Sequence, residues 1–418
     1  MKIFLVLSLF FSFCFGLNLN EAILLALKNS KRIQEEEFNI KRAQSTKRVQ
    51  YGNFAPKLEF RYSITQNTRI NGDIFTTNLS DIHASYNLFN GLKDFYSLKR
   101  YESLESAQRY LSEATRQDII LLAKTLYIQI LEARDNLAIS TESIRLLELQ
   151  RAQAEDFYLQ GLKAKSDLLS VEVMLANAKV TQSNDKNTLQ YALLSLQKLL
   201  NQNIALDSLE SLRSQDLNAL NFERAKLEDS MLRSRSEYLY LCALLDSLQY
   251  EKKIAQGAYL PKLDATFSRL WYSNDVSTLN RLGTNLQSQA KLSIIWNIFN
   301  GLSDRYVIES KHFEILSAQS RLVDLKRELN LALDKALSDL NIAKEQYEVS
   351  KNAVSLAEES YKIVQNRYRQ NIETSRELLN SEVALSQARL HFNQSEHRIN
   401  LALANLERIV QDSLKPTK

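Results

Sequence analysis

Four histidines are the residues of this sequence with the widest catalytic use, and their spacing does not fit a catalytic or metal site. They are His83, His312, His391 and His397. The last two lie six positions apart, which puts them on different faces of a helix. No His-Glu-x-x-His motif, triad spacing or Gly-rich phosphate loop occurs. We therefore predict that the chain is not an enzyme and has neither a metal site nor a cofactor.

The composition predicts very long structural elements. The 418 residues include only 8 Gly and 3 Pro, far fewer than a multidomain globular chain of this length carries. Few turn-forming residues mean few turns. The net charge is only +4, with basic and acidic residues interleaved, so we predict no nucleic-acid partner.

Residues 1–16 have the pattern of a secretory signal peptide. Lys2 is followed by an apolar run that is too short to span a bilayer comfortably. A membrane anchor and a buried helix are the alternatives. Cys14 is also a possible lipidation site, although Phe13 stands where lipoprotein signals have a small residue. Removal of the signal leaves Cys242 as the only cysteine, so we expect no intrachain disulfide and an ordinary core role for its thiol.

The chain contains two copies of one structural plan. Three motifs recur in the same order: 55–58 at 260–263, 87–92 at 297–302, and 158–169 at 368–379. The chain then divides into a signal peptide (1–16), a first repeat (17–201), a linker (202–221), a second repeat (222–412) and a tail (413–418). We expect the linker to be irregular and polar.

Within each copy the hydrophobic period changes from that of a helix to that of a strand. Residues 18–52 and 222–257 read as helices, with Asn18 or Asn20 as a possible cap of the first. After Pro56 and Pro261 the period becomes two, which predicts two strands per copy with one polar and one apolar face. The polar segments between the strands, 66–80 and 272–286, are expected to be loops.

A very long helical hairpin follows the strands in each copy. Neither Gly nor Pro occurs from Leu92 to Tyr158 or from Leu302 to Tyr368, and a helix of that length reaches roughly 100 Å. Apolar residues follow coiled-coil spacing at Leu329, Leu333, Ala336 or Leu337, Leu340 and Ala343. Helix resumes beyond the turns at 158–166 and 368–375 and runs to about 201 and 411. No stretch of the mature chain is apolar for long enough to predict a transmembrane helix.

Four strands with one apolar face cannot stand alone in a membrane. Unpaired backbone groups at the edges of an open sheet would cost several kcal/mol each in hydrocarbon. A closed barrel removes the edges, but about eight strands are the fewest that close one. We therefore expect three copies to form a 12-stranded transmembrane β-barrel, with their helices packed side by side into an α-barrel. Glu59, Arg61, His83 and Asn87 would line the lumen, and Tyr86, Trp271 and Trp296 would face the lipid boundary.

At this point the sequence resembles the TolC-like outer-membrane factors. The resemblance covers nearly the whole mature chain and depends on the order and spacing of individually weak motifs. These are the strand starts at Pro56 and Pro261, the Phe-Asn-Gly strand ends at Gly91 and Gly301, the Tyr158 hairpin, and Arg235-Ser236-Glu237-Tyr238. It implies a mainly helical homotrimer in the bacterial outer membrane that extends into the periplasm. It also implies a periplasmic adaptor and an inner-membrane pump as partners, in an efflux or type I secretion system.

The resemblance also implies functional positions at the two hairpin turns. The adaptor-contact tips map to Gly161, Leu162, Asn371 and Ile372. The periplasmic aperture, or gate, maps to Asp167, Tyr368, Glu373, Glu377 and Asn380. Glu373 stands where well-known members carry a gate arginine, so we expect an acidic aperture without that arginine. The alternative is that Glu373 and Glu377 form a solvated pair on one helix face.

A periplasmic coiled-coil adaptor or a structural filament protein is the alternative function. Either would explain the long helices. Neither explains strands with an amphipathic alternation at the same point of each repeat, and adaptors carry Gly-rich β modules that this chain lacks.

Overall fold

The structure is a computed structural model that describes residues 17–68, 70, 72, 74–212, 220–273 and 285–411. The predicted signal peptide, with Cys14, and the predicted tail lie outside the described residues. The chain forms two compact units. The hairpin unit comprises Met1–Gln34, Ala114–Arg235 and Glu328–Lys418, and the sheet unit comprises Glu35–Glu113 and Ser236–Arg327.

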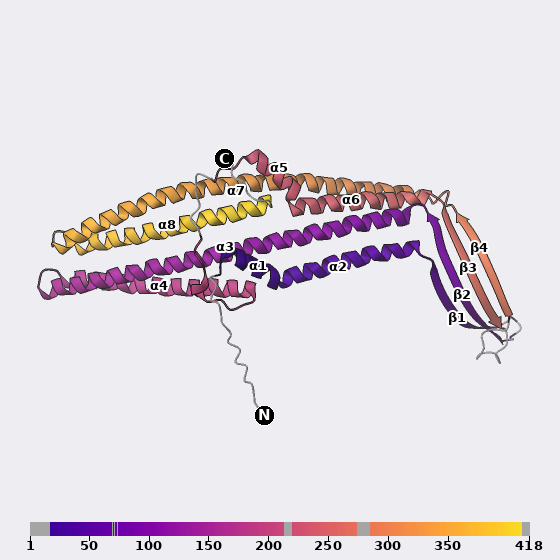
Figure 1. Ribbon diagram of the computed structural model, residues 1–418, viewed down its shortest axis with the longest axis horizontal. Helices are drawn as coiled ribbons and strands as arrows, with labels where there is room; N and C mark the ends of the chain where they lie inside the picture. The colour runs from indigo at the N-terminus through magenta and orange to yellow at the C-terminus, as the bar shows by residue number, and fades with distance from the viewer. Residues whose placement is uncertain are drawn as a thin grey trace, which may run out of the picture. The chain divides into compact units, whose positions relative to one another are not determined.

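The two halves of the chain contain the same elements in the same order (Figure 1). The first half has α1 (Leu19–Asn29), α2 (Lys31–Tyr51), β1 (Lys57–Thr68), β2 (Ile74–Asn90), α3 (Lys93–Leu159) and α4 (Lys165–Leu200). The second half has α5 (Arg224–Ser234), α6 (Ser236–Gln256), β3 (Lys262–Ser273), β4 (Asn285–Ile295), α7 (Ser303–Arg369) and α8 (Ser375–Val410). Corresponding helices have equal lengths of 11, 21, 67 and 36 residues. The prediction of a mainly helical chain with four strands is confirmed.

The first helix of each half is broken, where the sequence predicted one continuous helix. The breaks fall at Ser30 and Arg235, whose ψ angles of 122° and 111° are extended. Ser30 receives a hydrogen bond from the N–H of Ile33 at 3.4 Å, so it satisfies one of the free donors at the start of α2. At the start of α1, Asn18 forms a capping box with Glu21, as one of the two predicted caps.

The strands are longer than predicted, because part of each expected loop is strand. Residues 66–68 and 74–80 belong to β1 and β2, and 272, 273, 285 and 286 belong to β3 and β4. The polar composition of 66–80 suggested a loop, but its threonines favour strands and pair across the ladder, as Thr65 does with Thr77. Residues 274–284 lie outside the described part of the chain.

The four strands form one antiparallel sheet in the order β1-β2-β3-β4 (Figure 1). Directly paired residues share a face, and the registers place a continuous set of apolar side chains on one of them. This apolar face contains Leu58, Phe60, Tyr62, Ile64, Ile82, Ala84, Tyr86, Leu263, Ala265, Phe267, Trp271, Ala290, Leu292 and Ile294. The predicted alternation is therefore confirmed.

The opposite, polar face of the sheet holds the side chains that the sequence assigned to a lumen. Glu59, Arg61, His83 and Asn87 all lie on it. Arg61 forms an ion pair with Asp81 at 2.8 Å, and His83 Nδ1 lies 2.8 Å from the hydroxyl of Ser268. These cross-strand contacts lock the register that keeps the two faces distinct.

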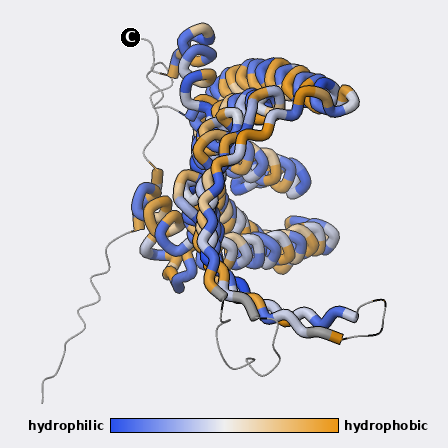
Figure 2. Tube along the Cα trace, turned by 90° about the vertical axis from the view of Figure 1, so that its right-hand side faces the viewer, coloured by the Kyte–Doolittle hydropathy of each residue, from blue (hydrophilic) through white to orange (hydrophobic). Residues whose placement is uncertain are grey.

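The long hairpins pack through the predicted coiled-coil positions. Leu329, Leu333, Ala336, Leu340 and Ala343 are all buried on α7, with Ala336 rather than Leu337 in the core. Apolar and polar residues alternate along the helices in Figure 2. Within the described ranges, no helix is apolar over enough of its length to cross a bilayer.

Cys242 is less deeply buried than an ordinary core residue. It lies half-buried on α6 and is a free thiol. Burial raises the pKa of its thiol, with the hydrogen bond to Tyr238 acting in the opposite direction. A thiol with a raised pKa carries little thiolate at neutral pH, so this cysteine is chemically quiet.

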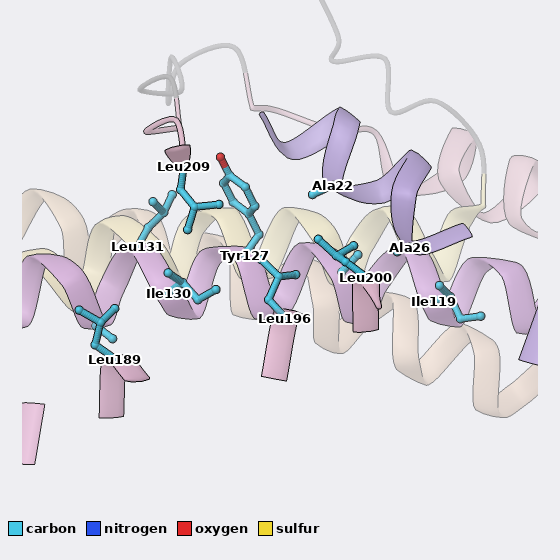
Figure 3. Packing of buried hydrophobic residues seen from close by; sticks show 12 residues of the cluster. Ala22, Ala26, Ile119, Tyr127, Ile130, Leu131, Leu189, Leu196, Leu200 and Leu209 are labelled. Atoms are coloured by element: carbon cyan, nitrogen blue, oxygen red, sulfur yellow. The ribbon is translucent and has the colours of Figure 1, made fainter. Parts of the chain in front are cut away.

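A hydrophobic cluster holds the start of the chain, two hairpin helices and part of the predicted linker together. Its side chains come from α1, α3, α4 and Leu209, and they gather around Tyr127 (Figure 3). Linker residues Ile204, Leu206 and Leu212 pack against it, so this part of the linker is apolar and ordered rather than polar. The Tyr127 hydroxyl lies 2.8 Å from the carbonyl oxygen of Leu17 and 2.6 Å from that of Glu210. Burial raises the pKa of Tyr127 to about 12, so the phenol is neutral and can donate.

Replacement of Tyr127 by Phe should lower the stability of the detergent-solubilised protein by about 1 kcal/mol, because a part-buried hydrogen bond from the phenol to the carbonyl of Glu210 is lost. The measurement is the thermal unfolding midpoint. Tyr191→Phe is the control, since Tyr191 lies on α4 with 73% of its surface exposed. Equal midpoints for the two variants would contradict the assigned role of the Tyr127 hydroxyl.

Candidate functional site at the hairpin tips

The two hairpin turns have the same backbone geometry. Gly161 has φ 71°, and its N–H donates to the carbonyl of Tyr158 while that of Leu162 donates to Phe157. This pair of bonds is a Schellman motif, which requires a left-handed residue at the turn. The second turn repeats it with Asn371 at φ 61°. Asparagine tolerates this conformation better than most residues, so the change from Gly costs little.

Both turns present an apolar residue to solvent. Leu162 is 50% exposed and Ile372, at the equivalent position, is 69% exposed. Leu159, which ends α3, is 75% exposed. Isolated exposed apolar residues are common on proteins. The same residue type at the apex of both hairpins is a feature that suits contact with another protein.

Tyr368 sits at the centre of the contact between the two hairpins. It is 1% exposed and packs against Phe157 of the first hairpin, with ring centroids 5.7 Å apart. The Ser375 hydroxyl donates to its phenol oxygen at 3.2 Å. Lys163, in the first turn, places its ammonium 5.6 Å from the Tyr368 ring centroid and donates to the carbonyl of Glu373 at 3.1 Å. Tyr368 thus links the two turns.

The surroundings of Tyr368 keep its phenol neutral. Burial raises the pKa of Tyr368, the hydrogen bond from Ser375 opposes that rise, and the nearby charge of Asp167 adds to it. Asp167 and Tyr368, both predicted gate residues, therefore lie close enough to interact electrostatically. Asp167 itself is half-buried near the start of α4.

The remaining predicted aperture residues, Glu373, Glu377 and Asn380, lie on α8 or just before it. Glu377 and Asn380 are exposed on the first turns of α8, where Thr374 caps the helix by accepting from the N–H of Glu377 at 3.2 Å. Glu373 is half-buried and precedes the helix. The interpretation of Glu373 and Glu377 as a pair on one helix face is therefore wrong, because only Glu377 is helical.

A seam of polar contacts joins α3 of the first hairpin to α8 of the second. Its antiparallel pairs are Asp118 with Arg408, Lys124 with Glu407, Asp135 with His397, Asn136 with Asn393, and Ser143 with Glu382. Arg408 and His397 are buried, whereas Asp118 and Asp135 are partly exposed. Hydrogen-bonded pairs of this kind fix the register between two helices, because a shift leaves buried groups unpaired.

Glu382 is the functional candidate that the sequence reading missed. It is 3% exposed on α8 and borders a cavity of about 250 Å³ lined by α3, α4 and α8. Burial raises the pKa of Glu382, while the hydrogen bond from Ser143 and the charge of Arg389 oppose this. The sequence did hold a signal for its burial. Leu378 and Leu385 have heptad spacing, and Glu382 lies between them, where it can share their buried face.

Comparisons with known proteins agree with this architecture. A family model for outer membrane efflux proteins matches residues 22–202 and 239–410. A membrane protein from Pseudomonas aeruginosa has a similar structure, with a TM-score of 0.82 and 16% identity over 94% of this chain and 93% of that chain. VceC from Vibrio cholerae has a TM-score of 0.81 and 15% identity over 94% of this chain and 95% of that chain. The CmeC outer membrane channel of Campylobacter jejuni has a TM-score of 0.81 and 16% identity over 94% of this chain and 85% of that chain. At such identities the likeness shows the fold alone. No curated protein sequence matches the chain.

Replacement of Glu382 by Gln should remove a pH dependence of stability. Because the pKa of Glu382 is raised in the folded state, the protonated form is favoured there. Its stabilising contribution is complete at low pH and is lost as the pH rises through that raised pKa. At pH 8 we expect the unfolding midpoint of the Glu382→Gln variant to exceed that of the wild type by about 2–4 °C, with no gain at pH 4.

Glu172→Gln is the matched control for this test. Glu172 occupies the same position in the first hairpin, but its side chain is 40% exposed and pairs with Arg151 at 3.3 Å. We expect it to leave the pH profile unchanged. A wild-type midpoint that does not fall relative to Glu382→Gln between pH 4 and pH 8 would refute the role of Glu382.

Proposed function

Because the chain belongs to the outer membrane efflux protein family, lies in the bacterial outer membrane and extends into the periplasm, we propose that it is the exit duct of a tripartite efflux or type I secretion system. In this proposal three copies close one barrel, and an adaptor and a pump deliver the substrate to the helical end. The chain conducts passively and carries out no chemical step. The amphipathic four-stranded sheet carries the proposal. A channel in a membrane needs such a sheet, whereas a periplasmic adaptor or a filament protein does not explain it.

The two edges of the sheet support closure by further copies. All residues of β1 are exposed, although β1 carries four large apolar side chains. At the other edge, Trp296, Ile298 and Phe299 follow β4 and are 60%, 84% and 75% exposed. The equivalent residues of the first half, 86–90, belong to β2, and most of them pair with β3. Residues 296–300 thus correspond to a strand segment, but among the described residues no strand pairs with them.

Two pairs of glycines also indicate that further copies close the sheet. Gly91, at the end of β2, packs so closely against Gly257 that a Cβ on Gly91 would lie 2.3 Å from the Gly257 carbonyl oxygen. The equivalent glycines of the duplication are Gly301, at the end of β4, and Gly52, before β1. Around each of these a Cβ would meet no atom of the described part of the chain within 4 Å. We infer that Gly301 of one copy meets Gly52 of the next.

The duplication also assigns the register between copies. His83 of β2 pairs with Ser268 of β3. Their equivalents are Ser293 of β4 and Ser63 of β1. Ser293 of one copy should therefore lie directly opposite Ser63 of the next, where Cβ atoms approach to about 4.5–5.5 Å.

A chain carrying both Ser63→Cys and Ser293→Cys should form disulfides between copies and give a covalent trimer on a non-reducing gel after mild oxidation, because the Cα atoms of directly opposite residues lie within bridging distance. Each single variant should give no trimer. Ser63→Cys with Ser288→Cys is the register control, since Ser288 lies five positions before Ser293 on β4 and on the other face. A wholly monomeric double variant would reject the ring.

The tips support docking and gating at the helical end. Leu162 and Ile372 offer paired apolar contacts to an adaptor, and Tyr368 holds the two turns together. Threefold symmetry would bring three copies of the exposed Glu377 toward one axis. Like charges gathered at a constriction attract cations and raise their local concentration.

Glu377→Gln should weaken block of the reconstituted channel by multivalent cations about ten-fold, if each of the three lost carboxylates contributes about 0.5 kcal/mol. The measurement is single-channel current in planar bilayers at increasing cation concentration. Glu348→Gln is the control, because Glu348 is exposed on α7 away from the turn. Unchanged block in Glu377→Gln would remove this residue from the aperture.

A further inference from the structure

Arg269 is the one charged residue on the apolar face of the described sheet. It pairs with Ile82 on β2 and Ser288 on β4, so it shares its face with Phe267 and Trp271. Its side chain is exposed. The acids of the described strands, Glu59, Asp81 and Asp264, project from the opposite face. Within the described strands no carboxylate therefore neutralises Arg269.

Two tryptophans mark the borders of a band on this sheet, and the height of that band matches the lipid-facing part of a membrane barrel. Trp271 pairs with Leu286, whereas Trp296 follows Ile295, which pairs with Lys262. They are thus separated by roughly ten positions of β3, or about 33 Å along the strand. At a strand tilt of about 40° this corresponds to a height of about 25 Å, which is the usual height of the apolar band between the two aromatic girdles.

Arg269 therefore lies just inside the border that Trp271 marks. Its guanidinium carbon is 5.6 Å from the Trp271 ring centroid, so the side chain reaches toward the tryptophan, where a cation–π contact stabilises it. An arginine on a lipid-facing surface costs most at the middle of the bilayer and little near the interface. The position and the contact together put the cationic group at headgroup level.

The side of the membrane follows from the direction of the strands. β3 begins at Lys262, immediately after helix α6 and Gly257–Tyr259, and Arg269 lies near its other end. The helices of an outer-membrane duct extend into the periplasm. The Arg269 end of the sheet therefore faces the outer leaflet, which is built from lipopolysaccharide, and the lipid A of that molecule carries phosphate groups.

We propose that Arg269, held against Trp271, binds a phosphate group of lipid A at the outer border of the barrel. A guanidinium binds a phosphate through two parallel hydrogen bonds, which a lysine ammonium cannot reproduce. The site would anchor the outer rim of the duct at a fixed depth in its leaflet. This proposal depends on the membrane orientation given under the proposed function.

The test measures binding of dansyl-labelled lipid A to the full-length channel in detergent. The sequence contains two tryptophans, so a Trp296→Phe background leaves Trp271 as the only donor for energy transfer to the label. On this background we expect Arg269→Gln to weaken the apparent affinity about five-fold, the effect of one lost cation at a membrane surface. The apparent affinity of Arg269→Lys should fall between those of the Arg269→Gln protein and the protein that keeps Arg269.

Lys291→Gln is the matched control, because Lys291 is an exposed cation on the polar face of the same sheet. It should leave the affinity unchanged. Equal affinity of the Arg269→Gln and unmodified proteins would overturn the proposal. Equal binding of dansyl-labelled phosphatidylglycerol would overturn the assignment to lipid A. Conductance of the same preparations in planar bilayers keeps the two proposals apart, since a preparation that forms pores but shows no effect of Arg269 refutes only the lipid site.

Discussion

The backbone hydrogen bonds of the sheet edges are the constraint on which the rest of this structure depends. In the described sheet β1 and β4 each have a partner on one side only, and a buried amide without a partner costs free energy comparable to a lost hydrogen bond. In water the open groups would be solvated, but an apolar face that contains Phe60, Phe267 and Leu292 directs the sheet to hydrocarbon, where no water is available. Closure around a ring is the arrangement that satisfies both requirements, and the open space at Gly52 and Gly301 is where it would occur.

The sequence predicted the architecture well where one physical signal dominated. Absence of Gly and Pro predicted the 67-residue helices α3 and α7 almost to their ends, and strict alternation separated Phe60 from Arg61 on the sheet. The prediction from sequence failed where local composition favoured one structure and tertiary pairing favoured another. The threonines and asparagines of 66–80 read as a loop, yet cross-strand pairing extends β1 and β2 through most of them. The break at Ser30 was also missed, because its serine is an ordinary helix residue by pattern alone.

At the tips the sequence located positions but not their environments. The motif match brought Tyr368 and the two turns to one region, and the left-handed Asn371 obeys the geometry expected of Gly161. It did not indicate that Tyr368 would be buried while its equivalent Tyr158 is 38% exposed. Nor did it indicate the contact of Lys163 with Glu373, two residues at equivalent positions of the duplication. Such differences arise from which surface each hairpin covers, and that information is absent from either repeat by itself.

The polar seam between α3 and α8 has a thermodynamic corollary. In a duplicated chain, the contact equivalent to α3 with α8 is that of α7 with α4, and the continuity of a ring would place these two on neighbouring molecules. A single polypeptide would then form only the contact of α3 with α8. The equivalent contact of α7 with α4 would form only when copies associate. The folding equilibrium would obey mass action, so that dilution alone would loosen the helices.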